Sequence, residues 1–87
     1  MKRKVILRRT QDKGGSRSLV ARLTDMGLVI EGHDLGPGVE EAFGAYEYEW
    51  TRTVAIEHLP TLEAFLGGPI LKVLKARYSG ENARDVD

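Results

Sequence analysis

The stretch from Ala45 to Glu57, which reads AYEYEWTRTVAIE, alternates large and polar residues almost without a fault. Side chains alternate between the two faces of a β-strand, so this pattern predicts one long strand. One face of that strand would carry Tyr46, Tyr48, Trp50, Arg52, Val54 and Ile56. Three of the six aromatic residues of the chain lie on this face, which would therefore either line the core or present a stacking surface.

Three shorter alternating segments precede the long strand and predict an antiparallel β-meander. They cover Arg3–Gln11, Arg17–Thr24 and Leu28–Asp34. Matching the apolar faces favours a three-residue first loop, which places Leu7 opposite Ala21. A two-residue second loop at Met26 and Gly27 would place Arg22 opposite Glu31, and this opposite-charge pair would help to fix the register.

Helical patterns flank the long strand. A short helical turn is expected at Val39–Phe43, before Gly44. After the strand, Pro60 suits the first turn of a helix that ends at Gly67, and a second helix should run from Ile70 to Tyr78.

These elements predict an α+β fold: a four-stranded antiparallel sheet (three-strand meander, short helix, long fourth strand) with two C-terminal helices packed on one face. That face would carry Leu7, Leu23, Ile30, Trp50 and Val54. Residues 1–78 should form a single domain of this kind, followed by a frayed C-terminal tail over residues 79–87.

The net charge of zero conceals a strong asymmetry along the chain. Residues 1–22 hold eight Lys or Arg residues and one Asp, whereas residues 23–63 hold nine acidic residues and one Arg. Either the two halves pair within the sheet, or the first hairpin presents a basic surface to an anionic partner. The candidate nucleic-acid-binding residues are Lys4, Arg8, Arg9, Arg17 and Arg22.

Single-stranded nucleic acid is bound by sheets that combine a positive groove with aromatic side chains. Here the aromatic stripe lies on a strand whose other face is acidic, which favours packing of Trp50 and the tyrosines beneath the C-terminal helices instead. Arg52 lies in the aromatic row, so its guanidinium should either stack on Trp50 or Tyr48 or reach a partner at the edge of the sheet.

The residue types needed for catalysis or metal binding are sparse. The chain has no cysteine, and its two histidines, His33 and His58, are accompanied by neither a nucleophile motif nor an evident set of three metal ligands. Glu47 and Glu49 share one strand face, but a solvated face or pairing with the basic hairpin is the simpler interpretation. We therefore expect no catalytic, cofactor or metal site, and no enzyme activity.

Ile6, Val20 and Val29 fall on the nominally outer face of the meander, which should therefore be covered by a helix, a second sheet or another copy of the protein. Together with Arg52 they are the candidate interface residues. We expect a cytoplasmic, non-enzymatic binding or interaction module that forms a homodimer or binds another protein, with single-stranded nucleic-acid binding as the alternative. No run of residues is long and apolar enough to predict a membrane partner.

Two resemblances bear on this expectation. The run Glu31–Gly44 (EGHDLGPGVEEAFG), followed by Glu47–Val54 (EYEWTRTV), is similar to a signature of small uncharacterised bacterial proteins, mostly actinobacterial, and implies no function. The order of elements also resembles the PC4 and Whirly type of transcription cofactor, which implies dimerisation and binding of single-stranded DNA. The short helix before the fourth strand departs from that pattern.

Overall fold

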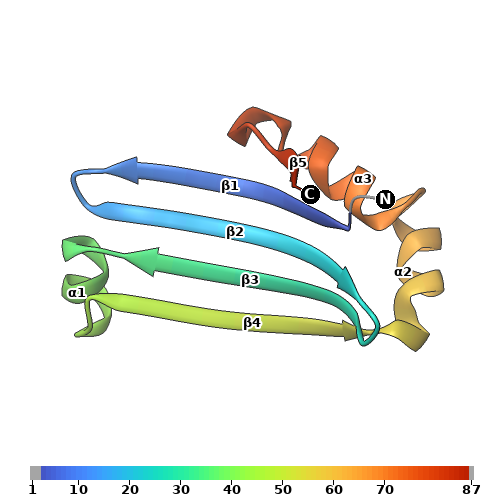
Figure 1. Cartoon of the computed structure of the whole chain (residues 1–87), viewed down its shortest axis with the longest axis horizontal. Helices are drawn as coiled ribbons and strands as arrows, with labels where there is room; N and C mark the ends of the chain where they lie inside the picture. The colour runs from blue at the N-terminus through green and yellow to red at the C-terminus, as the bar shows by residue number, and fades with distance from the viewer. Residues whose placement is uncertain (1–2, 87) are drawn as a thin grey trace.

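An open antiparallel sheet forms the body of the protein, and a meander lies at its centre (Figure 1). The computed structural model describes residues 3–86. The strands are β1 (Lys4–Asp12), β2 (Gly15–Thr24), β3 (Gly27–Leu35), β4 (Glu47–Ala55) and β5 (Arg84–Val86). Their order is β4-β3-β2-β1-β5. The α+β class and the antiparallel sheet are confirmed, but the prediction of four strands is wrong, because β5 adds a fifth beside β1.

The C-terminal helices cover only one end of one face of the sheet (Figure 1). After the 3₁₀ turn η1 (Ile56–His58), the chain forms α2 (Leu59–Leu66) and α3 (Ile70–Arg77). Ile70 and Leu71 of α3 are buried against Val5, Leu7, Ala21 and Leu28 of the sheet. We call this side of the sheet the helix face. The other side, which carries Val20, Val29 and Thr53, is the outer face.

A β-bulge in β1 overturns the predicted register of the first hairpin. The strands pair Val5 with Ala21 and Arg8 with Leu19, and the register shifts between these pairs at Leu7. The loop is Lys13–Gly14, so the expected pairing of Leu7 with Ala21 is wrong. The shift brings Arg8 to the helix face and sends Arg9 to the outer face, the reverse of what strict alternation gives.

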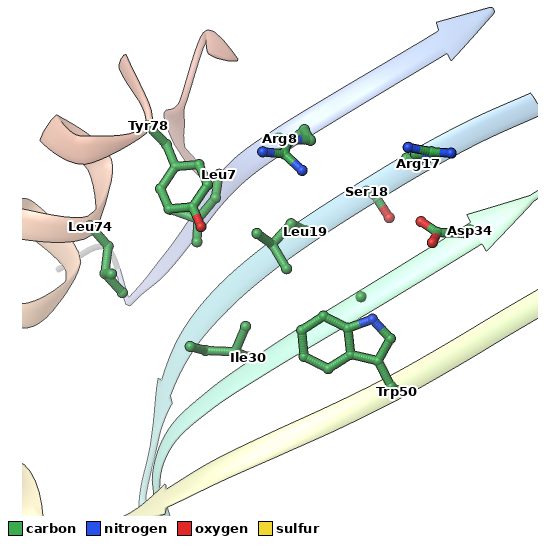
Figure 2. Close-up of a pocket in the computed structure, with 11 residues that line it drawn as sticks. Leu7, Arg8, Arg17, Ser18, Leu19, Ile30, Asp34, Trp50, Leu74 and Tyr78 are labelled. Carbon is green, nitrogen blue, oxygen red and sulfur yellow. The ribbon is translucent and has the colours of Figure 1, made fainter. Parts of the chain in front are cut away.

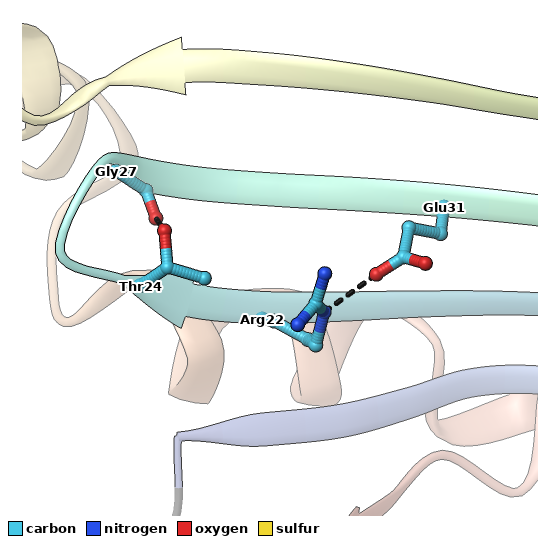
Figure 3. Close-up of polar contacts among 4 residues, drawn as sticks. All are labelled: Arg22, Thr24, Gly27 and Glu31. Carbon is cyan, nitrogen blue, oxygen red and sulfur yellow. Dashed lines mark hydrogen bonds and ion pairs between the residues drawn. The ribbon is translucent and has the colours of Figure 1, made fainter.

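The second hairpin also differs from the prediction, by two residues. Its turn is Asp25–Met26, and Arg22 lies opposite Val29. A two-residue slip leaves every side chain on its predicted face. Arg22 Nε still meets Glu31 Oε1 at 2.5 Å, but as a diagonal ion pair on the outer face (Figure 3).

The far end of the sheet is closed by α1 (Pro37–Phe43), which starts two residues before the expected position. Its first turn docks on the first hairpin, where Gly38 N donates to Gly14 O at 3.0 Å. Gly15 has a φ of +124°, and a Cβ there would overlap the Leu35 carbonyl. Only glycine therefore allows the hairpin loop to lie against the end of β3.

The C-terminal segment is built into the fold. Residues 79–86, expected to fray, form η2 (Ser79–Glu81) and β5, and Asp87 lies outside the described residues. Lys75 Nζ on α3 holds Asp85 Oδ2 of β5 at 3.1 Å. None of the helices within residues 3–86 is long and apolar enough to cross a membrane.

Candidate functional site

A hollow of about 430 Å³ lies on the helix face beyond the end of the helices. Its floor is formed by apolar side chains of the sheet, among them Leu19 and Ile30. Figure 2 shows these two side chains between Tyr78, which follows α3, and Trp50 on β4. We call this feature the basic-aromatic hollow. It is lined by Leu7, Arg8, Arg17, Ser18, Leu19, Ile30, Gly32, Asp34, Trp50, Leu74 and Tyr78.

The indole ring of Trp50 covers Gly32. The two residues are directly paired between β3 and β4, and a Cβ at Gly32 would overlap three atoms of the indole. The guanidinium carbon of Arg52 lies 5.9 Å from the centre of the Trp50 ring, a cation–π distance. Of the two alternatives expected for Arg52, the structure shows the contact with Trp50.

The C-terminal helices do not cover Trp50. Val54, four residues further along the same face of β4, packs against the core, whereas Trp50 is half-buried and lines the hollow. Tyr48 is 41% exposed and Tyr46 57% exposed. The expected packing of Trp50 and the tyrosines beneath the helices is therefore wrong, because α3 ends where the hollow begins.

Two of the predicted basic residues, Arg8 and Arg17, line the hollow. Arg8 is held by the helix end: its Nε lies 3.3 Å from Glu81 Oε2, and its guanidinium carbon lies 5.8 Å from the centre of the Tyr78 ring. Arg17 is exposed, lies opposite Asp34, and makes no ion pair within the described part of the chain. Its charge is thus the more accessible of the two.

The other three predicted basic residues lie away from the hollow. Lys4, Arg9 and Arg22 share the outer face, where Arg22 is paired with Glu31. The sheet therefore divides the basic hairpin between its two sides and does not gather it into one surface.

The predicted interface residues are divided in the same way. Ile6 is buried, at 6% exposure, and Val20 and Val29 are half-buried on the outer face, outside the cluster that packs on α3. Arg52 is exposed on the helix face. These four residues do not form one patch.

A second cluster lies on the outer face between β3 and β4. His33 Nε2 is 3.3 Å from Glu49 Oε1 and 3.6 Å from Glu47 Oε1. The expectation that His33 lacks convergent ligand groups is wrong, since one atom from each of these three side chains lies within 4.8 Å of the others. Glu47 and Glu49 thus face a histidine and not the basic hairpin.

Comparison of the chain with protein-family models, with curated proteins and with solved structures finds no match.

Proposed function

We propose that this protein is a non-enzymatic binding module that receives a partner in the basic-aromatic hollow. The observation that carries this proposal is the convergence of Trp50, Tyr78 and Arg17 around an apolar floor. Tryptophan, tyrosine and arginine are the residues that dominate binding energy at protein interfaces. A volume of about 430 Å³ is also within the range of natural ligand sites.

The chemistry of the lining supports binding over catalysis. Its charged groups are the guanidinium groups of Arg8 and Arg17 and the carboxylate of Asp34. Ser18 pairs with Arg9 and His33, so its side chain belongs to the outer face, where Ser18 Oγ donates to the backbone oxygen of His33 at 3.4 Å. This set can hold and orient a partner but contains no nucleophile with an adjacent base.

We further propose that the module forms a homodimer through β4. This strand is nine residues long, contains no proline, and is the edge strand of the sheet, so no described strand pairs with its free edge. An exposed edge of this length is a template for pairing with another chain. Antiparallel pairing of two copies of β4 would be symmetric, as most dimers are.

The sequence of β4 favours one register for this pairing. The two-fold axis would pass through Thr51, the middle residue of β4, so that all nine residues of each strand overlap. On the helix face, Trp50 would then lie opposite Arg52 of the second copy, and Tyr48 opposite its Val54. No like charges oppose each other in this arrangement, whereas an axis through Glu49 would place two carboxylates face to face.

Charged substitutions of Thr51, the residue at the two-fold axis, test the proposed dimer. Thr51 is exposed and would face its own copy, so Thr51→Asp and Thr51→Lys should each give monomers by repulsion. Thr51 also lies opposite Glu31 within the chain, so circular dichroism must first show that both variants are folded. Mixing the two variants should restore a dimer, because the charges are then opposite. Native mass spectrometry and light scattering at tens of micromolar measure the result, with Thr61→Asp on α2 as the matched control. A monomeric wild-type protein, or a dimeric Thr51→Asp variant, would overturn the proposal.

Single-stranded nucleic acid is the second candidate ligand of the hollow. It is favoured by the bulge in β1, which brings Arg8 to the same face as Arg17, Trp50 and Tyr48. Each base stacked on an aromatic ring contributes roughly 1–3 kcal/mol. The carboxylates of Asp34 and Glu81 beside the two arginines oppose this interpretation.

Titration of labelled single-stranded DNA and RNA at low and moderate salt tests whether nucleic acid is the ligand of the hollow. Nucleic-acid binding predicts a steep loss of affinity with salt, and weaker binding by Arg17→Ala and Trp50→Ala. Arg9→Ala, on the outer face of the same hairpin, is the matched control and should bind as the wild type does. Equal losses in Arg9→Ala and Arg17→Ala would place binding outside the hollow, and no binding at low salt rejects this candidate.

A further inference from the structure

Three side chains that can ligate metals converge on the outer face of the sheet. The pairing of β3 with β4 places His33 directly opposite Glu49, and Glu47 lies two residues along the same face of β4. The nine paired positions between these strands hold the backbone of all three residues in one rigid ladder. This convergence is independent of the hollow, which lies on the other side of the sheet.

Two of the three separations in this cluster resemble those between ligand atoms around an ion, and all three candidate ligand atoms lie within 4.8 Å of one another. Nε2 of His33 lies 3.3 Å and 3.6 Å from the two carboxylate oxygens, whereas N–H···O hydrogen bonds are about 2.7–3.2 Å long. Zinc binds nitrogen and oxygen at about 2.0–2.2 Å in a tetrahedron, so two of its ligand atoms lie about 3.4 Å apart. The two separations from His33 Nε2, 3.3 Å and 3.6 Å, are close to that value.

The surroundings of the His33 Nε2 atom provide a second observation. Nε2 of His33 is buried from solvent and makes no hydrogen bond with any described residue. The His33 side chain as a whole is 38% exposed, but a polar atom that is shielded from solvent and makes no hydrogen bond calls for a physical explanation. Nε2 of His33 lies within 3.6 Å of an oxygen from each of two carboxylates, so a divalent cation between the three groups could be coordinated by all of them.

We propose that His33, Glu47 and Glu49 bind a divalent transition-metal ion, with Zn²⁺ the best fit. One imidazole nitrogen and two carboxylate oxygens suit zinc and its neighbours, whereas Mg²⁺ and Ca²⁺ prefer ligand sets made of oxygen alone. Three protein ligands leave one tetrahedral position for water or for a group from a partner.

Isothermal titration of protein stripped with a chelator, using zinc chloride and then magnesium chloride, tests the proposal. We expect one zinc ion per chain and no comparable heat with magnesium. His33→Ala and Glu49→Gln should each weaken zinc binding by more than about 10-fold, since even residues behind a metal ligand contribute about 10- to 100-fold. His58→Ala, the chain's other histidine and exposed, and Glu57→Gln, also exposed, are the matched controls.

The visible absorption of bound Co²⁺ reports on the metal ligands themselves and therefore distinguishes loss of the site from a general folding defect. Co²⁺ at this site should give visible absorption bands of a low-coordinate ion, which disappear in His33→Ala and persist in His58→Ala. All four substituted residues are half-buried or exposed, and circular dichroism checks that each variant is folded. The proposal is overturned if zinc does not bind, if His33→Ala binds it as tightly as the wild type, or if His58→Ala abolishes binding equally.

Discussion

Replacement of Gly32 by Ala should lift the indole of Trp50 off the floor of the hollow. The new Cβ would overlap the Nε1, Cε2 and Cζ2 atoms of the ring, and the φ of Gly32 is not positive, so the backbone itself accepts alanine. Overpacking in proteins costs about 1–3 kcal/mol, and the lower end applies because Trp50 is half-buried and can swing outward. Loss of the contact with Arg52 adds about 0.5–1 kcal/mol.

The expected total is a loss of about 1–2 kcal/mol in the free energy of unfolding, and each kcal/mol lowers Tm by about 4–8 °C in a domain of this size. Trp50 is the only tryptophan, so its fluorescence reports the same event directly: the emission should shift to the red in the folded Gly32→Ala variant. Gly80→Ala is the control, since nothing lies within 4 Å of a Cβ at that position. Unchanged emission together with an unchanged urea midpoint would refute the placement of the indole on Gly32.

Three further changes test the packing that supports the site. Ile70→Ala removes a side chain that is 1% exposed and should cost about 2–5 kcal/mol by urea unfolding; a loss below about 1 kcal/mol would contradict its central place in the core. Glu63→Ala removes the carboxylate that accepts a hydrogen bond from Ile70 N at 3.1 Å, so α3 should lose about 1 kcal/mol of capping, and Glu63→Gln should retain most of it. A double-mutant cycle of Arg22→Ala and Glu31→Ala should give a coupling of only about 0.2–1 kcal/mol that declines with salt, because both side chains are 42% exposed; a coupling well above this range would show that the pair is shielded from solvent.

Alternation predicted which residues form strands more reliably than it predicted how the strands pair. The helix face was correctly assigned to Leu23, Ile30 and Val54, since faces depend only on the period of two. The bulge at Leu7 could not be predicted in this way. Val5, Ile6 and Leu7 are all buried, which strict alternation in a sheet with one covered face cannot achieve, and the consecutive apolar run was the local sign of the irregularity.

The register between β3 and β4 and the presence of β5 both depend on contacts between residues far apart in the sequence. The meeting of His33 with Glu49 requires the register between β3 and β4, and α1 with its flanking loops separates these strands, so no turn length fixes that register. β5 has only three residues, Arg84–Val86, and is held by backbone pairing with β1 and by the ion pair of Asp85 with Lys75. Neither contact leaves a hydrophobic pattern in the sequence.

The pairing of Lys4 with Val86 joins positions at opposite ends of the described chain, which lie close together in Figure 1. During synthesis the β1–β2 hairpin and β3 leave the ribosome before β5 and can associate without it, because domains fold as they emerge. The free edge of β1 then stays open until β5 arrives, and an unpaired edge can recruit another nascent chain. The three residues of β5 therefore cover this edge only after the rest of the sheet has been made. Truncation before Arg84 should reduce the soluble yield in cells more than it lowers the Tm of the protein that does fold.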